Sequence, residues 1–385
     1  MKTIKQLLIT VAVLLCSATA SAYDFVVDGI YYNIISAFDL TVGVTTGENK
    51  YSGDVIIPAT VTYKSKTLTV SSINGGAFKD CTALSSITIP NSITIIKKAA
   101  FYGCTSLTSV TIPNSVKKIE NEAFRDCKSL KELHIEDGET SLYFSMDNNN
   151  DFSRVFDYCL SLEKIHIGRD FDFYHCGSPS NSPFHGHYNL KTLTFSNYVT
   201  SIPENAFPYC KSLTDVEIPN SVTSIGESAF FGCTGLTNVT IGSNVSTIYY
   251  SAFEQCVSLT NIYLMCTTPP SVRSGNFTNT HYINTAVYVP QGSLATYQKA
   301  DTWKNFWDIQ EFDITAIENV EDVTPAFEIT SNGIQFTAAD SKTVAVYTIA
   351  GALIENVNSY AGETITLDKG VYIIRIGEKT TKVKL

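Results

Sequence analysis

The sequence predicts a β-rich repeat solenoid, with one parallel strand in each coil of about 23 residues, followed by a small antiparallel β-sandwich. Three observations predict this fold class. Phenylalanine recurs at a spacing of 23 residues through the middle of the chain. The recurrences are followed by an alternating triplet of apolar, variable and apolar residues, with V-x-I as its clearest form, and this alternation has the periodicity of a strand. The final part of the chain consists of short alternating runs separated by glycine.

The first 22 residues have the pattern of a secretory signal peptide. Lys2 and Lys5 provide a positive start, and residues 7–16 form an apolar run that is too short to span a bilayer. Small residues then precede a cleavage position between Ala22 and Tyr23. We therefore expect the fold to begin at Tyr23, and we expect the protein to be exported to the outer cell surface or secreted.

Residues 23–76 are expected to form an N-terminal capping β region. Short apolar runs at residues 31–32, 55–58 and 68–70 have the character of strands. Such a cap covers the exposed edge of the first coil, which would otherwise pair with other chains.

Residues 77–266 contain the repeat, with insertions near residues 137–150 and 170–187. Each unit reads A-F-x-x-C-x-x-L-x-x-V-x-I-P-x-S-V-x-x-I, and residues 101–119 and 207–225 are the clearest copies. One unit cannot bury its own apolar face, so neighbouring coils must cover each other. Proline ends the V-x-I strand because it has no amide hydrogen for the sheet. The A-F-x-x-C-x-x-L stretch spaces apolar residues by three, which predicts a helical or 3₁₀ turn.

Nine cysteines remain after the signal segment, and seven of them lie three residues after a repeat phenylalanine. Free cysteine is among the most buried residue types, and parallel side chains on stacked coils are poorly placed for disulfides. No C-x2-C pair typical of zinc sites is present. We therefore expect a column of buried thiols, formed by Cys81, Cys104, Cys127, Cys159, Cys210, Cys233 and Cys256. Cys176 and Cys266 lie off this column, and the sequence leaves open whether they are paired.

The chain after the repeat divides into three parts. Residues 267–312 are expected to form a C-terminal cap, with a last strand at residues 287–290 and a short helix at residues 294–307. An acidic linker follows at residues 313–325. Residues 326–385 are expected to form the β-sandwich, with strands at 334–337, 344–349, 363–367, 371–376 and 380–385.

The repeat resembles the leucine-rich repeat of the BspA-like type. The resemblance rests on the agreement of many copies in spacing and residue type, over roughly residues 24–312. It implies a right-handed, curved solenoid with an adhesive or ligand-binding role. It also implies a place on the surface of an anaerobic, host-associated bacterium.

The last part of the chain resembles the C-terminal sorting domain of Bacteroidetes type IX secretion substrates. The resemblance is carried by residues 346–351 (VYTIAG), 367–376 (LDKGVYIIRI) and the basic ending 379–385 (KTTKVKL). It implies transport by the secretion machinery across the outer membrane, removal of the tail, and release or attachment at the surface. An ordinary accessory β-domain is the alternative.

The composition argues against several function classes. The formal net charge is −10 and the basic residues form no runs, so nucleic acid and anionic membrane surfaces are not expected partners. No apolar stretch after the signal segment reaches the ~18 residues of a membrane-spanning helix. No H-E-x-x-H, G-x-S-x-G, phosphate-binding or dinucleotide-binding motif is present. We therefore expect neither an enzyme nor a bound cofactor.

Outward residues of the strands are expected to line one continuous surface, because side chains alternate along each strand. In successive coils the central outward positions are Thr88, Thr111, His134, His166, Thr194, Glu217, Thr240 and Tyr263. The outward positions two residues earlier are Ser86, Ser109, Glu132, Lys164, Thr192, Asp215, Asn238 and Asn261. Threonine is common on exposed strands through propensity alone. The candidate ligand-binding residues are therefore those that depart from Ser, Thr and Asn: His134, His166, Glu217, Tyr263, Glu132, Lys164 and Asp215. The alternative is a face that only keeps the protein soluble.

The insertion near residues 170–187 holds a second group of candidates. His175, Cys176, His185 and His187 lie close together in sequence, but their spacing matches no familiar metal-ligand pattern. We therefore expect no metal. A hydrolase that uses Cys176 within residues 137–188 is a further alternative.

Together these features predict an exported adhesin or binding module for a host matrix protein, a glycan or another microbe. The main alternative is a structural surface protein without a specific ligand.

Overall fold

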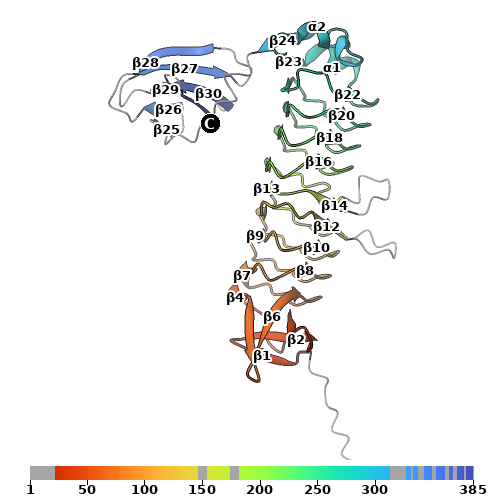
Figure 1. Cartoon of the computed structure of the whole chain (residues 1–385), viewed down its shortest axis with the longest axis vertical. Helices are drawn as coiled ribbons and strands as arrows, with labels where there is room; N and C mark the ends of the chain where they lie inside the picture. The colour runs from red at the N-terminus through yellow and green to blue at the C-terminus, as the bar shows by residue number, and fades with distance from the viewer. Residues whose placement is uncertain are drawn as a thin grey trace, which may run out of the picture.

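The computed structural model describes residues 22–145, 154–173 and 182–312, together with the strands of a C-terminal region between residues 327 and 384. Within residues 22–312 the chain forms a stack of coils between two caps, and the stack runs along the longest axis of the molecule (Figure 1). The predicted β-solenoid is therefore confirmed.

Each coil contains a strand where the V-x-I triplet predicts one. These first-row strands are β7 (Leu84–Thr88), β9 (Ser109–Ile112), β11 (Glu132–Ile135), β13 (Lys164–Ile167), β15 (Thr192–Phe195), β17 (Asp215–Ile218), β19 (Asn238–Ile241) and β21 (Asn261–Leu264). The row continues in β23 (Ala286–Pro290) and β24 (Asp308–Phe312). From β9 onwards the strands pair in parallel as two sheets, in the orders β15-β13-β11-β9 and β17-β19-β21-β23-β24, and β15 contacts β17. β7 contacts β9 but pairs in parallel with β4 (Gly53–Ile56) of the N-terminal cap.

A second strand in most coils corrects the prediction of one strand per coil. These second-row strands are β8 (Ile95–Ile96), β10 (Lys118–Ile119), β12 (Leu142–Phe144), β14 (Phe171–Phe173), β16 (Ser201–Ile202), β18 (Ser224–Ile225), β20 (Thr247–Ile248) and β22 (Ser271–Val272). They pair in parallel with one another and form a separate column from the first row (Figure 1). Six of the eight contain only two residues, and two residues cannot show the alternation that identifies a strand in a sequence.

The A-F-x-x-C-x-x-L stretch forms two consecutive turns and not a continuous helix. In one coil, the Cys104 N–H donates to the Phe101 carbonyl and the Leu107 N–H donates to the Cys104 carbonyl, each at 3.2 Å. The Phe101 N–H instead donates to the carbonyl of Ala123 on the next coil, at 2.7 Å. Bonds between coils therefore take the donors that a helix would use within itself.

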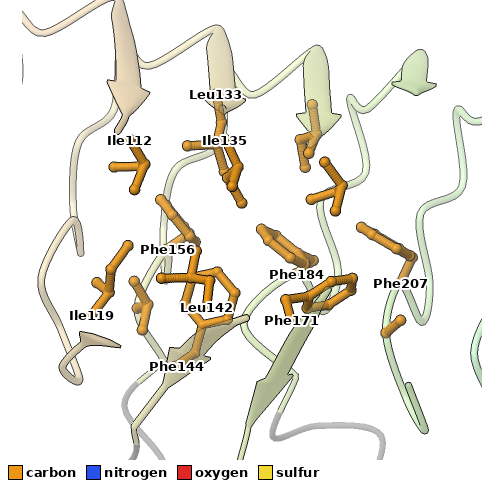
Figure 2. Close-up of a cluster of buried hydrophobic side chains, with 14 of the residues drawn as sticks. Ile112, Ile119, Leu133, Ile135, Leu142, Phe144, Phe156, Phe171, Phe184 and Phe207 are labelled. Carbon is orange, nitrogen blue, oxygen red and sulfur yellow. The ribbon is translucent and has the colours of Figure 1, made fainter. Parts of the chain in front are cut away.

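The repeat phenylalanines form one stacked column in the core. Neighbouring ring centroids along the column are 4.9 to 6.5 Å apart. Figure 2 shows the middle of this core, where Phe144 and Phe171 of the second row meet Phe184 edge to face at 5.6 and 5.9 Å. The rings from Phe78 to Phe253 are buried and Phe277 at the end of the column is partly buried, so both rows of strands are fixed to one apolar interior.

The expected insertions are partly built into the coils. β12 and β14 lie within them and pair in parallel with each other. Arg169 is fully buried nearby, and its guanidinium donates to the carbonyls of Pro113 at 2.8 Å and Thr140 at 3.3 Å. The same burial lowers the pKa of Arg169. The remaining residues of the insertions, 146–153 and 174–181, lie outside the described residues.

The N-terminal cap has six strands: β1 (Phe25–Val27), β2 (Ile30–Ser36), β3 (Thr41–Thr45), β4 (Gly53–Ile56), β5 (Thr60–Tyr63) and β6 (Lys66–Ile73). β1, β2 and β3 pair antiparallel, and β6 pairs in parallel with β3 and with β8 of the second row. Tyr51 contacts Tyr31 at 5.9 Å and Phe78 at 4.5 Å between ring centroids. The cap therefore extends the aromatic column over the first coil.

The C-terminal cap corrects the prediction of one helix at residues 294–307. It contains α1 (Asn279–Asn284), α2 (Leu294–Tyr297) and a 3₁₀ turn (Trp303–Asn305). Thr302 has a φ of 71°, which no α-helix contains, so α2 cannot continue into the 3₁₀ turn. The Trp303 indole N–H donates to the Pro270 carbonyl at 2.9 Å, which ties this cap to the last coil.

The C-terminal region contains two antiparallel sheets. Their strands are β25 (Phe327–Thr330), β26 (Gly333–Phe336), β27 (Lys342–Thr348), β28 (Leu353–Ser359), β29 (Thr364–Thr366), β30 (Val371–Ile376) and β31 (Lys379–Lys384). The sheet orders are β25-β26-β29 and β28-β27-β30-β31. β25 and β28 lie outside the strands that the sequence predicted. That the two sheets pack as a sandwich stays a prediction.

Candidate binding face

The outward side chains of the first-row strands form a strip that runs from coil to coil. Parallel pairing in register produces two rows: Thr111, His134, His166 and Thr194, and then Glu217, Thr240, Tyr263 and Tyr288. Neighbouring strands lie about 4.8 Å apart, so residues that are distant in sequence become neighbours on this strip. We name the part on β9 to β15 the histidine section and the part on β17 to β24 the tyrosine section.

A stacked pair of imidazoles lies at the centre of the histidine section. The ring centroids of His134 and His166 are 4.7 Å apart, with 12° between the ring planes. His166 is held on both sides, because its Nε2 lies 3.1 Å from Asp137 Oδ1 and its Nδ1 lies 2.9 Å from Thr194 Oγ1. The register therefore brings the two predicted histidines together. The sequence pattern missed Asp137, because this residue lies beyond the strand and has no repeat position of its own.

Charged side chains of the histidine section form ion pairs between neighbouring coils, and of these the sequence predicted Glu132 and Lys164 as candidates. Lys164 Nζ lies 2.7 Å from Glu132 Oε1, and Lys191 Nζ lies 3.1 Å from Glu163 Oε2. The hydrogen bond from Lys164 to Glu132 raises the pKa of Lys164, and the bond from Lys191 lowers the pKa of Glu163. All four side chains are exposed, so salt screens these pairs and they contribute little to stability.

Tyr263 in the tyrosine section departs from the prediction of an exposed outward residue, because it is only 8% exposed. Its ring stacks on Tyr288 at a centroid distance of 4.7 Å, and Phe312 meets it edge on at 6.4 Å. Burial raises the pKa of Tyr263 to about 12, and Tyr288 and Asp215 add to the shift. The sequence did not predict this cover, because β24, which contributes Phe312, has no repeat signature.

Asp215 and Glu217 keep their predicted outward positions. Asp215 Oδ1 accepts a hydrogen bond from Asn238 Nδ2 at 2.8 Å, and Asn238 Oδ1 accepts one from Asn261 Nδ2 at 2.8 Å. Glu217 is exposed at the end of its row. The tyrosine section therefore combines carboxylates, side-chain amides and two tyrosines.

The predicted column of seven buried thiols is confirmed, and the thiols are free. Cys127 Sγ, for example, donates to the Phe101 carbonyl at 3.2 Å. Cys266, which the sequence left as a candidate for pairing or reaction, is also free and buried, and its Sγ lies 3.1 Å from the Gly242 carbonyl. Burial raises the pKa of Cys266 to about 11, so its thiol is neutral and unreactive at physiological pH.

The histidine and cysteine candidates of the insertion do not assemble a site in the described residues. His187 takes the cysteine position of its coil and is buried, and burial lowers its pKa to about 4. His185 contacts Arg154, and burial followed by this positive charge lowers the pKa of His185 to about 4. His175 and Cys176 lie outside the described residues. Among those described, no group of His, Cys, Asp and Glu could hold a metal ion.

Comparison with protein families decides the class of the repeat. Residues 60–176 and 177–298, more than half of the chain, match the family described as the BspA type leucine rich repeat region (6 copies). The chain belongs to this family. Its BspA-type repeats comprise the coils with their two rows of strands and the phenylalanine column. No curated protein matches the chain.

Solved structures of other leucine-rich repeat proteins resemble the chain at low identity. A leucine-rich repeat protein from Bacteroides ovatus is 22% identical, with a TM-score of 0.34, over 71% of this chain and 81% of that chain. A leucine rich cell surface protein from Faecalibacterium prausnitzii is 22% identical, with a TM-score of 0.28, over 74% of this chain and 94% of that one. The pneumococcal vaccine antigen PcpA is 16% identical, with a TM-score of 0.29, over 76% and 99% of the two chains. No helix in the described part of the chain is long and apolar enough to cross a membrane.

Proposed function

We propose that this BspA-type repeat protein is an exported surface protein that binds a macromolecule through the outward face of its first-row strands. The macromolecule is a host matrix protein, a glycan or a component of another microbe. One observation carries the proposal: the register aligns charged, imidazole and phenol side chains of successive coils on one continuous strip. None of these side chains is needed to fill the core, which the phenylalanines and aliphatic residues already occupy.

The scaffold supports binding better than catalysis. Among the described cysteines, every thiol is buried, so none is available as a nucleophile. The hydrolase alternative depends on Cys176, and it predicts an activity that the Cys176→Ala variant loses. The structural alternative predicts self-association without a ligand.

An array of matrix proteins and glycans, probed with residues 23–385, tests the binding proposal. We expect saturable binding to at least one component. Charge reversal on the face, by Lys164→Glu or Glu217→Lys, should weaken this binding by roughly tenfold, in the range measured for interface charges. Glu227→Lys is the matched control, since Glu227 is also exposed but lies in a turn outside the first-row strands. Equal binding by all variants, or no binding at all, contradicts the proposal.

We also propose that residues 1–22 direct export, with cleavage between Ala22 and Tyr23, and that residues 326–385 direct sorting through type IX secretion. The charged and apolar segments of the N-terminus and the C-terminal motifs support this route. A chain truncated after residue 325 should then stay in the periplasm of a bacterium with that machinery, while the full chain reaches the surface. Surface display of the truncated chain would identify the tail as an accessory domain.

A further inference from the structure

We propose that the tyrosine section of the face recognises an arginine-bearing segment of a partner protein. This inference rests on the proposed binding function, because it names the ligand chemistry of one part of the same face. The residues that form this site are Tyr263 and Tyr288, with the carboxylates of Asp215 and Asp308 on either side.

The charge of the tyrosine section favours a cation. Its ten outward positions contain no Lys, Arg or His; they are Asp215, Glu217, Asn238, Thr240, Asn261, Tyr263, Ala286, Tyr288, Asp308 and Gln310. Asp215 and Asp308 place two carboxylates close enough to the tyrosines to act on them electrostatically. A cation is attracted to such a surface, whereas an anion is repelled.

The two tyrosines lie between carboxylates. Asp215 acts electrostatically on Tyr263, and Asp308 acts on Tyr288, so each raises the pKa of its neighbour beyond the effect of burial. Tyr288 is the more accessible ring of the stacked pair. A guanidinium that reaches Tyr288 can therefore contact the ring and a carboxylate together, which is the arrangement that arginine's planar fork satisfies best.

Tyr263 adds a hydrogen-bond donor to the strip. The residue is only 8% exposed, but its Oη is not among the described buried polar atoms that lack a partner, so this hydroxyl reaches the surface or is bonded. No described hydrogen bond uses it, and a hydroxyl at the surface is available to a bound peptide. With a pKa near 12 this hydroxyl keeps its hydrogen at neutral pH, so it can donate to a peptide carbonyl beside the bound guanidinium. A peptide segment offers both groups, and a free metal ion offers neither.

Fluorescence anisotropy with a labelled peptide of alternating arginine and glycine tests the proposal on the chain from Tyr23 to Leu385. The matched probe replaces each arginine by citrulline, which has the same shape without the charge. We expect saturable binding of the arginine peptide and at least a tenfold weaker response to the citrulline peptide.

Variants distinguish binding at the tyrosine section from nonspecific electrostatic attraction of the cationic peptide to an acidic protein. Asp215→Asn with Asp308→Asn should weaken binding roughly tenfold, and Tyr288→Leu should weaken it about fivefold, as the loss of one cation–π contact implies. The control is Glu139→Gln with Glu227→Gln, which removes the same charge from exposed positions off the tyrosine section. Equal loss in the control pair overturns the proposal, and so does unchanged binding in both tyrosine-section variants. If Tyr288→Leu does not fold, the Asp215→Asn/Asp308→Asn double variant alone decides between the two outcomes.

The outcome is distinguishable from failure of the proposed function. If a ligand from the array is lost on Lys164→Glu while the arginine peptide never binds, the binding face stands and this inference falls. If neither the array nor the peptide gives saturable binding, both fall.

Discussion

At the scale of single residues, the position three after the repeat phenylalanine accepts different chemistry but stays buried in the eight coils from Phe78 to Phe253. Seven coils place cysteine there, and one places His187. The thiols donate to carbonyls of the preceding coil, as Cys233 does to Phe207 at 3.3 Å. The imidazole of His187 leaves its Nε2 without a partner in the described structure. A buried imidazole therefore makes this coil sensitive to acid, while the thiols do not.

The buried thiols should resist alkylation. Burial raises the pKa of Cys81 to about 11, and the pKa values of the column cysteines Cys127, Cys210 and Cys256 are also raised. Iodoacetamide at pH 8 should therefore leave the seven column cysteines and Cys266 unmodified in the native chain, since the thiolate is the reactive form. Peptide mass spectrometry reads the result, and a guanidinium-unfolded sample is the control. Rapid native labelling of Cys127 would contradict the burial of the column.

The His187 coil should lose stability in acid. The pKa of His187 is about 4 in the fold against an ordinary value of 6.5, so the unfolded chain binds more protons between these values. Stability is therefore complete above pH 6.5 and falls as the pH is lowered towards 4, by at most about 3 kcal/mol from this group. His187→Cys, which restores the repeat residue, should flatten the dependence of the unfolding free energy on pH between 6.5 and 4. An unchanged slope would assign the acid sensitivity to other groups.

At the scale of elements, the turns between the rows of strands hold ordinary residues in the left-handed region. Ala99, Glu122, Asn205 and Ser251 all have a φ between 54° and 58°. Gly76 and Gly275 occupy the corresponding place in the first and last coils, at 65° and 86°. Glycine adopts this conformation without the steric cost that a Cβ adds, so these turns store a small strain in each coil.

Ala99→Gly should stabilise the solenoid by roughly 1 kcal/mol, because it removes the left-handed penalty of a residue whose methyl group is not fully buried. Ala123→Gly is the contrast, since Ala123 is fully buried and is not in the left-handed region. That variant should destabilise the protein. Chemical unfolding monitored by circular dichroism measures both changes, and the same sign for the two variants would be inconsistent with a strained turn.

The sequence predicted the elements whose residue pattern is long enough, or recurs in enough coils, to be recognised. The V-x-I triplets, the phenylalanine spacing and the cysteine column give the first-row strands and the core. The second-row strands, such as Lys118–Ile119, are too short for alternation, and their pairing depends on the coil above and below. The helix predicted at residues 294–307 is divided at Thr302, where contacts with the last coil override local propensity. On the face, register alone joins His134 to His166, whereas Asp137 and Tyr288 enter from segments without a repeat signature.

At the scale of the whole molecule, one apolar column joins the coils. A substitution that removes a ring from the middle of this column therefore affects the coils on both sides. Phe124 is fully buried between Phe101 and Phe156, with ring centroids at 4.9 and 5.4 Å. Because each coil contacts only its neighbours, the stability of the stack depends on the contacts between adjacent coils.

Phe124→Ala should therefore lower the unfolding free energy by about 3–5 kcal/mol, through lost burial and the cavity left behind. Val257→Ala is the control at an exposed position, where a change below about 0.5 kcal/mol is expected. Urea unfolding measures both values. A small effect at Phe124 would show that the coils do not depend on the column.

The central claim is that stacked coils place residues far apart in sequence on one continuous face. Electron–electron distance measurement between spin labels at Thr111 and Glu217 tests it most directly, in a Cys176→Ser background in which the column thiols stay buried. Thr111 on β9 and Glu217 on β17 are four strands apart, so the backbone separation should be about 19 Å, with a narrow distribution. A broad distribution centred well beyond about 30 Å would contradict the stacked register and with it the binding face.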